Sequence, residues 1–280
     1  MIITKLKGGL GNQMFQYAFG RSISHINKEE LRLDISNFDY NGPNTPRHYQ
    51  LDIFNIEAKI IPPEKIKKIS WINKIRPYYK KLIIRERYFH FDPQIIRKYN
   101  YAIFDGYWQS EKYFIDIKNI ITEELSLKKK YIDEIEKNLI NKIKNNNSVS
   151  IHIRRGDYVN DKTTNLHHGT CPLDYYHRAI KIILANNKKS IFFIFSDDID
   201  WVKKNLKLLH PSFFISGNKD YEDLFLMSLC KHNIIANSSF SWWAAWLNNN
   251  PNKTVAAPKK WFNNPHQNTK DLIPKPWIKI

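Results

Sequence analysis

The C-terminal half of the sequence predicts an α/β fold with a parallel sheet. Short apolar segments recur there, at residues 149–153, 191–195, 213–215, 233–236 and 254–256. Segments with helical periodicity lie between or after them, at residues 173–186, 199–209, 221–230 and 240–248. Short apolar strands that alternate with helices form parallel sheets covered on both faces, and nucleotide-binding domains are usually built this way.

The N-terminus has a strand, turn and helix pattern of its own. Ile2 and Ile3 begin a short strand, the turn Gly8-Gly9-Leu10-Gly11-Asn12-Gln13 follows, and residues 14–26 have the periodicity of a helix. A glycine turn between a strand and a helix presents backbone amides to an anion. This turn matches neither the GxGxxG fingerprint nor the P-loop, so a tight turn without a ligand is the alternative interpretation.

The middle of the chain is less regular. Residues 39–113 are rich in aromatic residues, prolines and arginines, which predicts loops and short helices along one wall of a cleft. Aromatic rings there would either stack on sugar rings or pack in the core. A polar helix is predicted over residues 131–144, and Asn145-Asn146-Asn147 follows it as a linker.

A length of 280 residues suits one large domain or two of ordinary size, and the change in pattern favours two. We predict a first domain at 1–146 that contains the glycine loop and a second, Rossmann-like domain at 147–258. The tail at 259–280 is expected to pack back on the first domain.

The composition restricts the class of protein only weakly. The 44 Lys and Arg against 27 Asp and Glu give a net charge of +17, which favours nucleotides, nucleic acid or anionic lipid as partners. The charge is dispersed through an Asn-, Lys- and Ile-rich background. Cys171 and Cys230 form no CxxC pair, so reduced thiols in the cytoplasm are expected. No run of eighteen apolar residues occurs, so neither a membrane span nor an export signal is predicted.

The segment Ser150-Ile-His-Ile-Arg-Arg-Gly-Asp-Tyr-Val159 carries the clearest functional signal. Alternation along a strand places His152 and Arg154 on one face, while Arg155 points to the other. Arg154 would lie at the carboxyl end of the strand, where α/β sheets bind ligands and where a guanidinium can hold a phosphate with two hydrogen bonds. A local ion pair between Arg155 and Asp157 is the alternative. Adhesion through Arg-Gly-Asp would need a secreted protein.

A second polar loop, Ser196-Asp197-Asp198, also follows an apolar strand. One aspartate could accept hydrogen bonds from a ribose or a guanine, while the other caps the next helix. Asp198 and Asp200 also have the spacing of a metal-binding DxD motif. That alternative is weakened because Asp200 falls in a first helical turn, where acidic residues are common.

The third loop, Asn237-Ser-Ser-Phe-Ser-Trp-Trp243, places Ser238, Ser239 and Phe240 at a helix N-terminus, a second site suited to phosphate. Trp242 and Trp243 are expected in the core. The histidines of the chain lack the spacing of a metal site, and His168 stays open as a base.

Three motifs together resemble the bacterial α-1,2-fucosyltransferases: residues 8–18 (GGLGNQMFQYA), 152–158 (HIRRGDY) and 237–245 (NSSFSWWAA). The resemblance implies a GT-B-like α/β fold, in which two Rossmann-like domains face each other across a cleft. It implies that Arg154 holds the β-phosphate of GDP-fucose and that His152 supports the nucleotide. The other implied contacts with substrate are made by Gly9, Asn12, Arg155, Asp197, Asp198, Ser238, Ser239 and Phe240.

The implied reaction transfers L-fucose with inversion from GDP-β-L-fucose to the 2-hydroxyl of a terminal β-galactoside, in the synthesis of surface polysaccharide such as lipopolysaccharide O-antigen. No metal or other cofactor is expected. Asp157 is the nearest carboxylate to serve as base, and a route without a protein base stays open. The enzyme is expected in the cytoplasm, with peripheral contact to the anionic inner membrane. The alternatives are a transferase for another GDP-sugar and a basic nucleic-acid-binding protein, in which lysines, arginines and aromatics would form a stripe.

Overall fold

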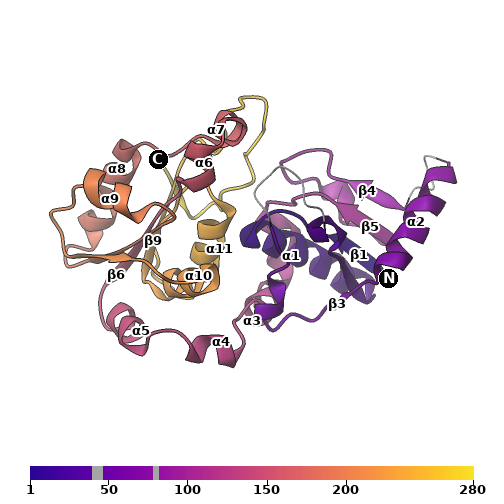
Figure 1. Ribbon diagram of the computed structural model, residues 1–280, viewed down its shortest axis with the longest axis horizontal. Coiled ribbons are helices and arrows are strands. Elements are labelled where there is room, and N and C mark those ends of the chain that lie inside the picture. Colours follow the sequence, from indigo (N-terminus) through magenta and orange to yellow (C-terminus); the bar gives the residue numbers. More distant parts are fainter. Residues whose placement is uncertain (40–46, 78–81) are drawn as a thin grey trace. The chain divides into compact units, whose positions relative to one another are not determined.

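The computed structural model describes residues 1–39, 47–77 and 82–280, which form two compact units. The first unit comprises Met1–Ser126 and Asn268–Leu272, and the second comprises Leu127–Gln267 and Ile273–Ile280. Each unit is built on its own parallel sheet (Figure 1). The α/β class predicted from the alternating segments is therefore confirmed.

The sheet of the first unit has the strand order β3-β2-β1-β5-β4, and all its paired strands are parallel. Its strands are β1 (Ile2–Lys5), β2 (Leu31–Asp34), β3 (Lys59–Ile60), β4 (Ile83–Arg85) and β5 (Ala102–Asp105). Its helices are α1 (Leu10–Asn27), α2 (Pro63–Ile75) and α3 (Lys118–Glu124). Short 3-10 turns lie at Ser36–Asp39, Leu51–Ile53, Pro93–Ile95, Glu111–Tyr113 and Ile115–Ile117.

Loops and short helices were predicted for residues 39–113, and this was wrong in one respect. The segment contributes three strands to the first sheet and also contains the helix α2. The strands are two to four residues long, too short for alternation to be recognised. They are specified by pairing: β3 pairs with β2, β5 pairs with β1, and β4 pairs with β5. Residues 40–46 and 78–81 of that segment lie outside the described residues.

The second unit is a six-stranded parallel sheet of order β11-β10-β9-β6-β7-β8. Its strands are β6 (Ser148–Ile153), β7 (Ile191–Ser196), β8 (Ser212–Ile215), β9 (His232–Ile234), β10 (Val255–Ala257) and β11 (Ile278–Lys279). Its helices are α4 (Lys129–Asp133), α5 (Lys137–Lys144), α6 (Gly156–Asn160), α7 (Lys162–His168), α8 (Leu173–Asn186), α9 (Ile199–Asn205), α10 (Asp220–Leu229) and α11 (Ser239–Leu247). The predicted strands and helices of this half agree with these bounds within a few residues.

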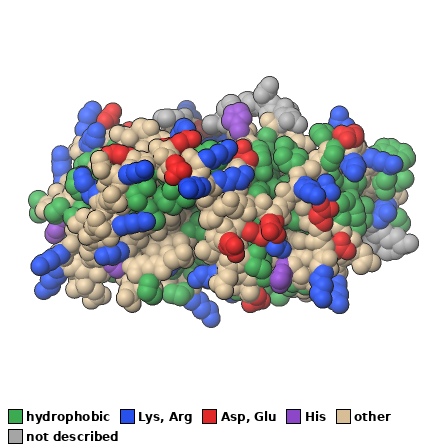
Figure 2. Space-filling view, turned by 90° about the horizontal axis from the view of Figure 1, so that it is seen from below, with side chains coloured by type: hydrophobic (Ala, Val, Ile, Leu, Met, Phe, Trp, Pro, Cys, Tyr) green, Lys and Arg blue, Asp and Glu red, His purple; other side chains and the backbone are tan. Residues whose placement is uncertain are grey.

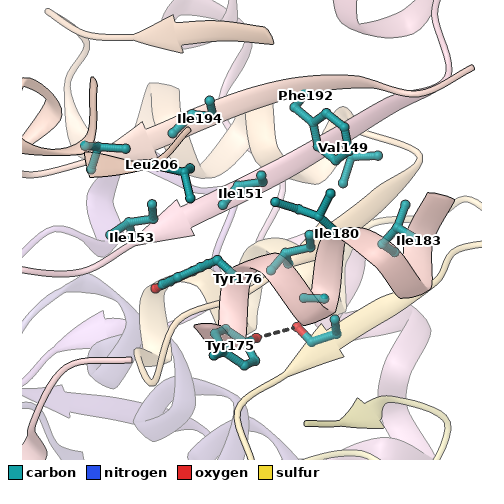
Figure 3. Close-up of a cluster of buried hydrophobic side chains, with 14 residues drawn as sticks. Val149, Ile151, Ile153, Tyr175, Tyr176, Ile180, Ile183, Phe192, Ile194 and Leu206 are labelled. Carbon is teal, nitrogen blue, oxygen red and sulfur yellow. Dashed lines mark hydrogen bonds between the residues drawn. The ribbon is translucent and has the colours of Figure 1, made fainter. Parts of the chain in front are cut away.

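The side chains of β6 alternate between the two faces of the sheet, one apolar and the other polar. Val149, Ile151 and Ile153 face α8 and α9 and pack with Tyr176 and Ile180 in one buried cluster (Figure 3). On the same side, the hydroxyl of Tyr175 donates a hydrogen bond to the carbonyl of Ile235 at 2.6 Å.

The opposite face of β6 is polar. The side-chain amide of Asn233 donates to Ser150 Oγ at 2.8 Å and to the carbonyl of Met227 in α10 at 2.9 Å. His152 follows Ser150 on this face, so the alternation predicted for the motif is observed.

Residues 127–146 belong with the second unit, although the predicted boundary placed them in the first. Ile143 of α5 is fully buried, and Lys142 lies 4.2 Å from the ring centre of Phe213. Tyr131 packs against Tyr221, and Glu134 accepts a hydrogen bond from the Tyr221 hydroxyl at 2.8 Å. These contacts attach the segment to the second sheet's helices. The single helix predicted at 131–144 is in fact two, α4 and α5.

The C-terminal tail is divided between the units. Only Asn268–Leu272 belongs with the first unit, where Asp271 accepts hydrogen bonds from Lys112 Nζ at 2.5 Å and from the backbone of Phe91 at 3.2 Å. The last residues form β11, which pairs in parallel with β10. The prediction that residues 259–280 pack on the first domain is therefore wrong for most of the tail, which belongs with the second unit.

Two smaller predictions concern the cysteines and the membrane. Cys171 and Cys230 are both free thiols. Over the described ranges of the chain, no helix combines the length and the apolar character needed to cross a bilayer.

Candidate functional site

The carboxyl ends of three neighbouring strands carry the polar loops singled out from the sequence. β6 lies between β7 and β9, with Ile151 paired to both Ile194 and Ile234. Because the strands are parallel, the loops after them emerge at one edge of the sheet, which is where such folds bind ligands. The structure thus brings the motif at 152–158, the loop at 196–198 and the loop at 237–239 to the same edge of the second unit.

Arg154 is held by Asp197 across two of these loops. Arg154 Nη1 lies 2.9 Å from Asp197 Oδ2, and each side chain is 25% exposed. Asp197 Oδ1 also accepts the backbone amide of Arg155 at 2.8 Å. Gly156 makes this approach feasible, because a Cβ at that position would lie 2.5 Å from Asp197 Oδ2. Asp197 is one of the two aspartates expected to contact ribose or guanine, and in the structure it orients the guanidinium of Arg154.

Arg155 has a separate set of partners. Its Nε lies 3.1 Å from Asp198 Oδ2, and its guanidinium carbon lies 3.5 Å from the ring centre of Trp201. The other carboxylate oxygen of Asp198 accepts the backbone amide of Trp201 at 3.2 Å and caps α9. The predicted cap is observed, and Arg155 forms an ion pair with Asp198. The side chain of Asp157, the alternative partner of Arg155, is outside the described residues.

The metal alternative for the same loop has little geometric support. Asp198 is engaged by Arg155, whereas the Asp200 side chain is 83% exposed and faces Lys203 at 3.8 Å. Throughout the described part of the chain, no three His, Cys, Asp or Glu side chains are grouped as a metal site requires.

His152 is buried next to the helix that follows β9. It is 4% exposed, and its ring centre lies 5.6 Å from that of Phe240. Burial, with a smaller contribution from the charge of Arg154, lowers the pKa of His152 from 6.5 to about 3. Among the described residues, its Nδ1 has no hydrogen-bond partner. The imidazole is therefore neutral at pH 7 and can act as a donor or acceptor of a hydrogen bond but not as a cation.

Helix α11 begins at Ser239, directly after the loop from β9. The N-cap residue, Ser238, makes no side-chain cap hydrogen bond, so the amides of the first turn are not satisfied by it. Unsatisfied amides at the start of a helix attract anions. Ser238, Ser239 and Phe240 thus take the positions predicted for them, and Trp242 and Trp243 are fully buried, as predicted.

Asn237 fixes this loop, a role that the motif's spacing did not reveal. Its side-chain amide donates to the carbonyls of His168, Gly169 and Trp261, each at 3.1 Å. Its own carbonyl accepts the hydroxyl of Tyr158 at 3.4 Å, which connects the loop to α6. An asparagine that is 2% exposed and satisfied in this way holds three segments in one arrangement.

Tyr158 also supports Arg154. The Arg154 guanidinium carbon lies 5.4 Å from the ring centre of Tyr158, whose other neighbour is His168, stacked at 4.7 Å and 13°. Phe262 packs on His168 at 5.2 Å. His168, the alternative base, is accordingly part of an aromatic stack behind the arginine.

Asp157 was the predicted carboxylate for a base. Its backbone lies in α6, but its side chain is outside the described residues. Its role as a base stays a prediction.

Gly9 and Asn12 belong to the first unit. Gly8 has φ of +79°, a left-handed conformation that favours glycine, and Gly9 is the N-cap of α1. Asn12 Oδ1 accepts a hydrogen bond from Gln109 at 2.7 Å. The glycine loop therefore takes the strand, turn and helix geometry predicted from the sequence.

Two buried glutamines of α1 hold the glycine loop, and sequence reasoning did not assign them a role. Gln16 exchanges two hydrogen bonds with the backbone of Lys7, at 2.9 and 3.2 Å. Gln13 donates to the carbonyls of Gly8 and His48 and accepts the amide of Gln50. Their spacing of three residues, one face of a helix, is the signal that could have identified them.

The surface charge is not organised as a nucleic-acid site on the face shown in Figure 2. Lys and Arg side chains are spread across that face, with Asp and Glu among them, and they form no continuous stripe.

Parallel α/β units with cationic loops at the strand ends are typical of nucleotide-binding enzymes. Residues 1–280 match the family described as Glycosyl transferase family 11, and the chain belongs to this family. The α-1,2-colitosyltransferase of Escherichia coli is 36% identical over 294 residues, which cover 100% of this chain and 99% of that protein. The O-antigen biosynthesis glycosyltransferase WbnK of Escherichia coli is 35% identical, over 98% of this chain and 99% of its own length.

More distant relatives include the mouse galactoside 2-α-L-fucosyltransferase Sec1, which is 26% identical over 88% of this chain and 64% of its own length. Among solved structures, the fucosyltransferase NodZ from Bradyrhizobium has a TM-score of 0.52 at 14% identity, covering 87% of this chain and 91% of its own. POFUT1 in complex with GDP has a TM-score of 0.52 at 13% identity, covering 91% and 97%. These likenesses confirm the predicted GT-B-like fold class.

Proposed function

We propose that this glycosyltransferase moves L-fucose from GDP-β-L-fucose to the 2-hydroxyl of a terminal β-galactoside, with inversion and without a metal. The observation that carries the proposal is the pair Arg154–Asp197 at the carboxyl end of β6, on the sheet edge that also presents the N-terminus of α11. The family membership and the names of the relatives support it.

The reaction depends most on the groups that stabilise the leaving diphosphate. As the glycosidic bond to GDP breaks, positive charge develops on the sugar and negative charge on the departing phosphate. Arg154 is oriented by Asp197, and the α11 amides supply further donors. Preorganised donors of this kind are commonly the largest contribution to catalysis, and losing one typically costs ~10²–10³-fold in turnover.

His152 contributes as a neutral group. Since its pKa is lowered to about 3, it carries no charge at physiological pH and would not compete with Arg154 for the phosphate. Its Nδ1, which has no partner among the described residues, can hydrogen-bond the nucleotide. The proton of the acceptor hydroxyl passes either to a carboxylate, with Asp157 as the first candidate, or to the departing phosphate itself.

A second donor follows from one comparison. The α-1,2-colitosyltransferase is as similar to this chain as WbnK is. Colitose is fucose without its 3-hydroxyl, so the two GDP-sugars share every nucleotide contact. A site that hydrogen-bonds the 3-hydroxyl rejects the deoxy sugar strongly, whereas one that packs against carbon there tolerates both.

The proposal also covers where in the cell the enzyme acts. The name of WbnK points to O-antigen synthesis, and we propose a cytoplasmic enzyme that builds a surface polysaccharide and touches the anionic inner membrane peripherally. The net charge of +17 supports such contact.

The test measures GDP release from GDP-fucose, GDP-colitose and GDP-mannose in parallel, with and without lactose, in excess EDTA. Release that requires both GDP-fucose and lactose supports the proposal, and analysis of the product by NMR assigns the linkage. Release with GDP-colitose alone selects the second donor. Release only after manganese is added would overturn the metal-independent reaction.

A further inference from the structure

The carboxyl edge of the first unit's sheet carries its own cluster of polar side chains. β1, β5 and β4 are neighbouring parallel strands, so the residues at their ends share this edge. Lys7 follows β1, Asp105 ends β5 and Arg85 ends β4. Lys7 Nζ lies 2.8 Å from Asp105 Oδ1, and Arg85 Nε lies 4.0 Å from Asp105 Oδ2. The cluster is at the position where parallel sheets bind ligands, as in the second unit.

The turn after β5 is held in a strained conformation by a carboxylate. Glu86 accepts the backbone amides of Tyr107 at 2.7 Å and Trp108 at 2.9 Å. Gly106 has no room for a side chain, since a Cβ there would lie 2.5 Å from Glu86 Cβ. Trp108 has φ of +55°, a left-handed conformation that is strained in a residue other than glycine.

Burial of the Trp108 ring offsets this strain, and the same turn leaves the neighbouring ring of Tyr107 partly exposed. Trp108 is 1% exposed and stacks on Phe19 with 4.1 Å between ring centres. Tyr107, by contrast, is 37% exposed, and Lys7 Nζ lies 4.9 Å from its ring centre. The sharp turn therefore presents an aromatic face beside the ion pair of Lys7 and Asp105.

The same turn is connected to the glycine loop. Gln109 is 6% exposed and donates its side-chain amide to Asn12 Oδ1 at 2.7 Å. Within the described residues its Oε1 has no partner, and a water or a ligand hydroxyl would satisfy it. The aromatic face, the ion pair and the glycine loop are thereby coupled within one unit.

We propose that Tyr107, Asp105 and Lys7 form the subsite for the galactose ring of the acceptor. The inference rests on the proposed function and assigns its acceptor-binding residues. A β-galactoside has an apolar face of C–H groups that packs on an aromatic ring, and hydroxyls at its rim that pair with a carboxylate and an ammonium. The ring of Tyr107 would pack on the C–H face. Asp105 would accept hydrogen bonds from the hydroxyls, and Lys7 would donate hydrogen bonds to them.

The pairing of Lys7 with Asp105 favours a sugar hydroxyl over an anion at this position. Lys7 is already paired with Asp105 at 2.8 Å, and both are partly buried. An incoming phosphate would face the carboxylate directly, whereas a hydroxyl can bond to both partners without separating their charges. The geometry therefore suits a sugar and not a second nucleotide.

The test is a steady-state comparison of variants of the full chain, with lactose as acceptor and GDP-fucose as donor. We expect Tyr107→Ala to raise the KM for lactose by about tenfold, the value of one aromatic packing contact, while Tyr107→Phe keeps it close to the wild-type value. Asp105→Asn is expected to raise the same KM by about tenfold or more, because a charged hydrogen bond is weakened. The KM for GDP-fucose should stay at the wild-type value, because the proposed subsite contacts only the acceptor.

Trp71→Ala is the matched control. Trp71 is an aromatic in the same unit, 64% exposed on α2. Asn73 of the same helix accepts the amide of Ile83, the first residue of β4, so this part of α2 lies at the opposite edge of the sheet. The control should leave both KM values unchanged.

Two results would count against the inference, and they separate its two parts. Lactose-dependent GDP release with an unchanged lactose KM in Tyr107→Ala and Asp105→Asn would overturn the subsite and leave the proposed function intact. Absence of lactose-dependent release in the wild type, despite binding of GDP-fucose, would overturn the galactoside acceptor and the subsite with it.

Discussion

Replacing Gly156 by alanine should separate the activity of this enzyme from its stability. The new Cβ would lie 2.5 Å from Asp197 Oδ2 and 3.1 Å from Asp197 Cγ. That is about 1 Å short of ordinary van der Waals contact, so the carboxylate must withdraw by a similar amount. The contact between Asp197 and Arg154 Nη1, now 2.9 Å, would then exceed hydrogen-bonding distance.

The expected loss is in turnover. A displacement of about 1 Å at a positioning group can cost ~10²-fold in rate, and we expect kcat to fall by one to two orders of magnitude. The fold should be unaffected, because Gly156 begins α6 and alanine is favoured over glycine in a helix by about 1 kcal/mol. The assay is GDP release with GDP-fucose and lactose, together with thermal unfolding followed by circular dichroism.

The comparison variant is Asp197→Asn, which keeps the size of the side chain and removes its charge. Both variants should impair turnover and retain a cooperative unfolding transition. Wild-type turnover in Gly156→Ala would refute the reasoning that Asp197 orients Arg154. A large loss of melting temperature would mean that the clash is relieved by the backbone and not by the carboxylate.

Four further outcomes are expected. Arg154→Ala should lower turnover at least ~100-fold with the fold intact, and near-normal turnover would contradict the diphosphate role. EDTA should leave turnover unchanged, and recovery that depends on manganese would contradict the metal-independent reaction. Because burial lowers the pKa of His152 from 6.5 to about 3, the unfolded chain binds a proton in this pH window that the folded chain does not, so stability falls as the pH drops below 6.5. The loss should reach ~2 kcal/mol at pH 5, and urea unfolding of His152→Asn should show a flatter pH dependence than the wild type. Arg21→Ala should destabilise the first unit by ~3 kcal/mol in the same assay, since Glu124, 7% exposed and paired with Arg21 at 2.9 Å, would keep a buried charge without its cation.

The second unit was predicted best where its elements are long enough to show their period, and its shorter strands were found because they alternate with helices along the chain. Six-residue strands such as β6 and β7 are apolar throughout or alternate clearly, and helices such as α8 extend over fourteen residues. The first unit was predicted only at β1 and α1. Its remaining strands have two to four residues, and their identity depends on the neighbours with which they pair.

The domain boundary also could not be predicted from the local sequence. Asn145-Asn146-Asn147 has the composition of a linker, yet it is a turn between α5 and β6 within one unit. The Asn147 side-chain amide donates to Ser190 Oγ at 3.1 Å, next to the start of β7. Composition reports the local preference for a turn, but only packing decides whether a turn connects domains or elements.

The sequence by itself determined which polar loops would gather at one edge of the second unit's sheet. Parallel strands end at one edge of a sheet, so polar residues placed directly after apolar strands must gather there, and His152, Arg154, Asp197 and Ser239 do so within the second unit. Only the tertiary structure decided which residues pair: Asp197 with Arg154, Asp198 with Arg155, Gln16 with the backbone of Lys7. The physical reason is the separation along the chain of the residues that interact. Periodicity depends on residues close in sequence. Ion pairs and hydrogen bonds between loops depend on strand register and on side-chain packing between residues far apart in sequence.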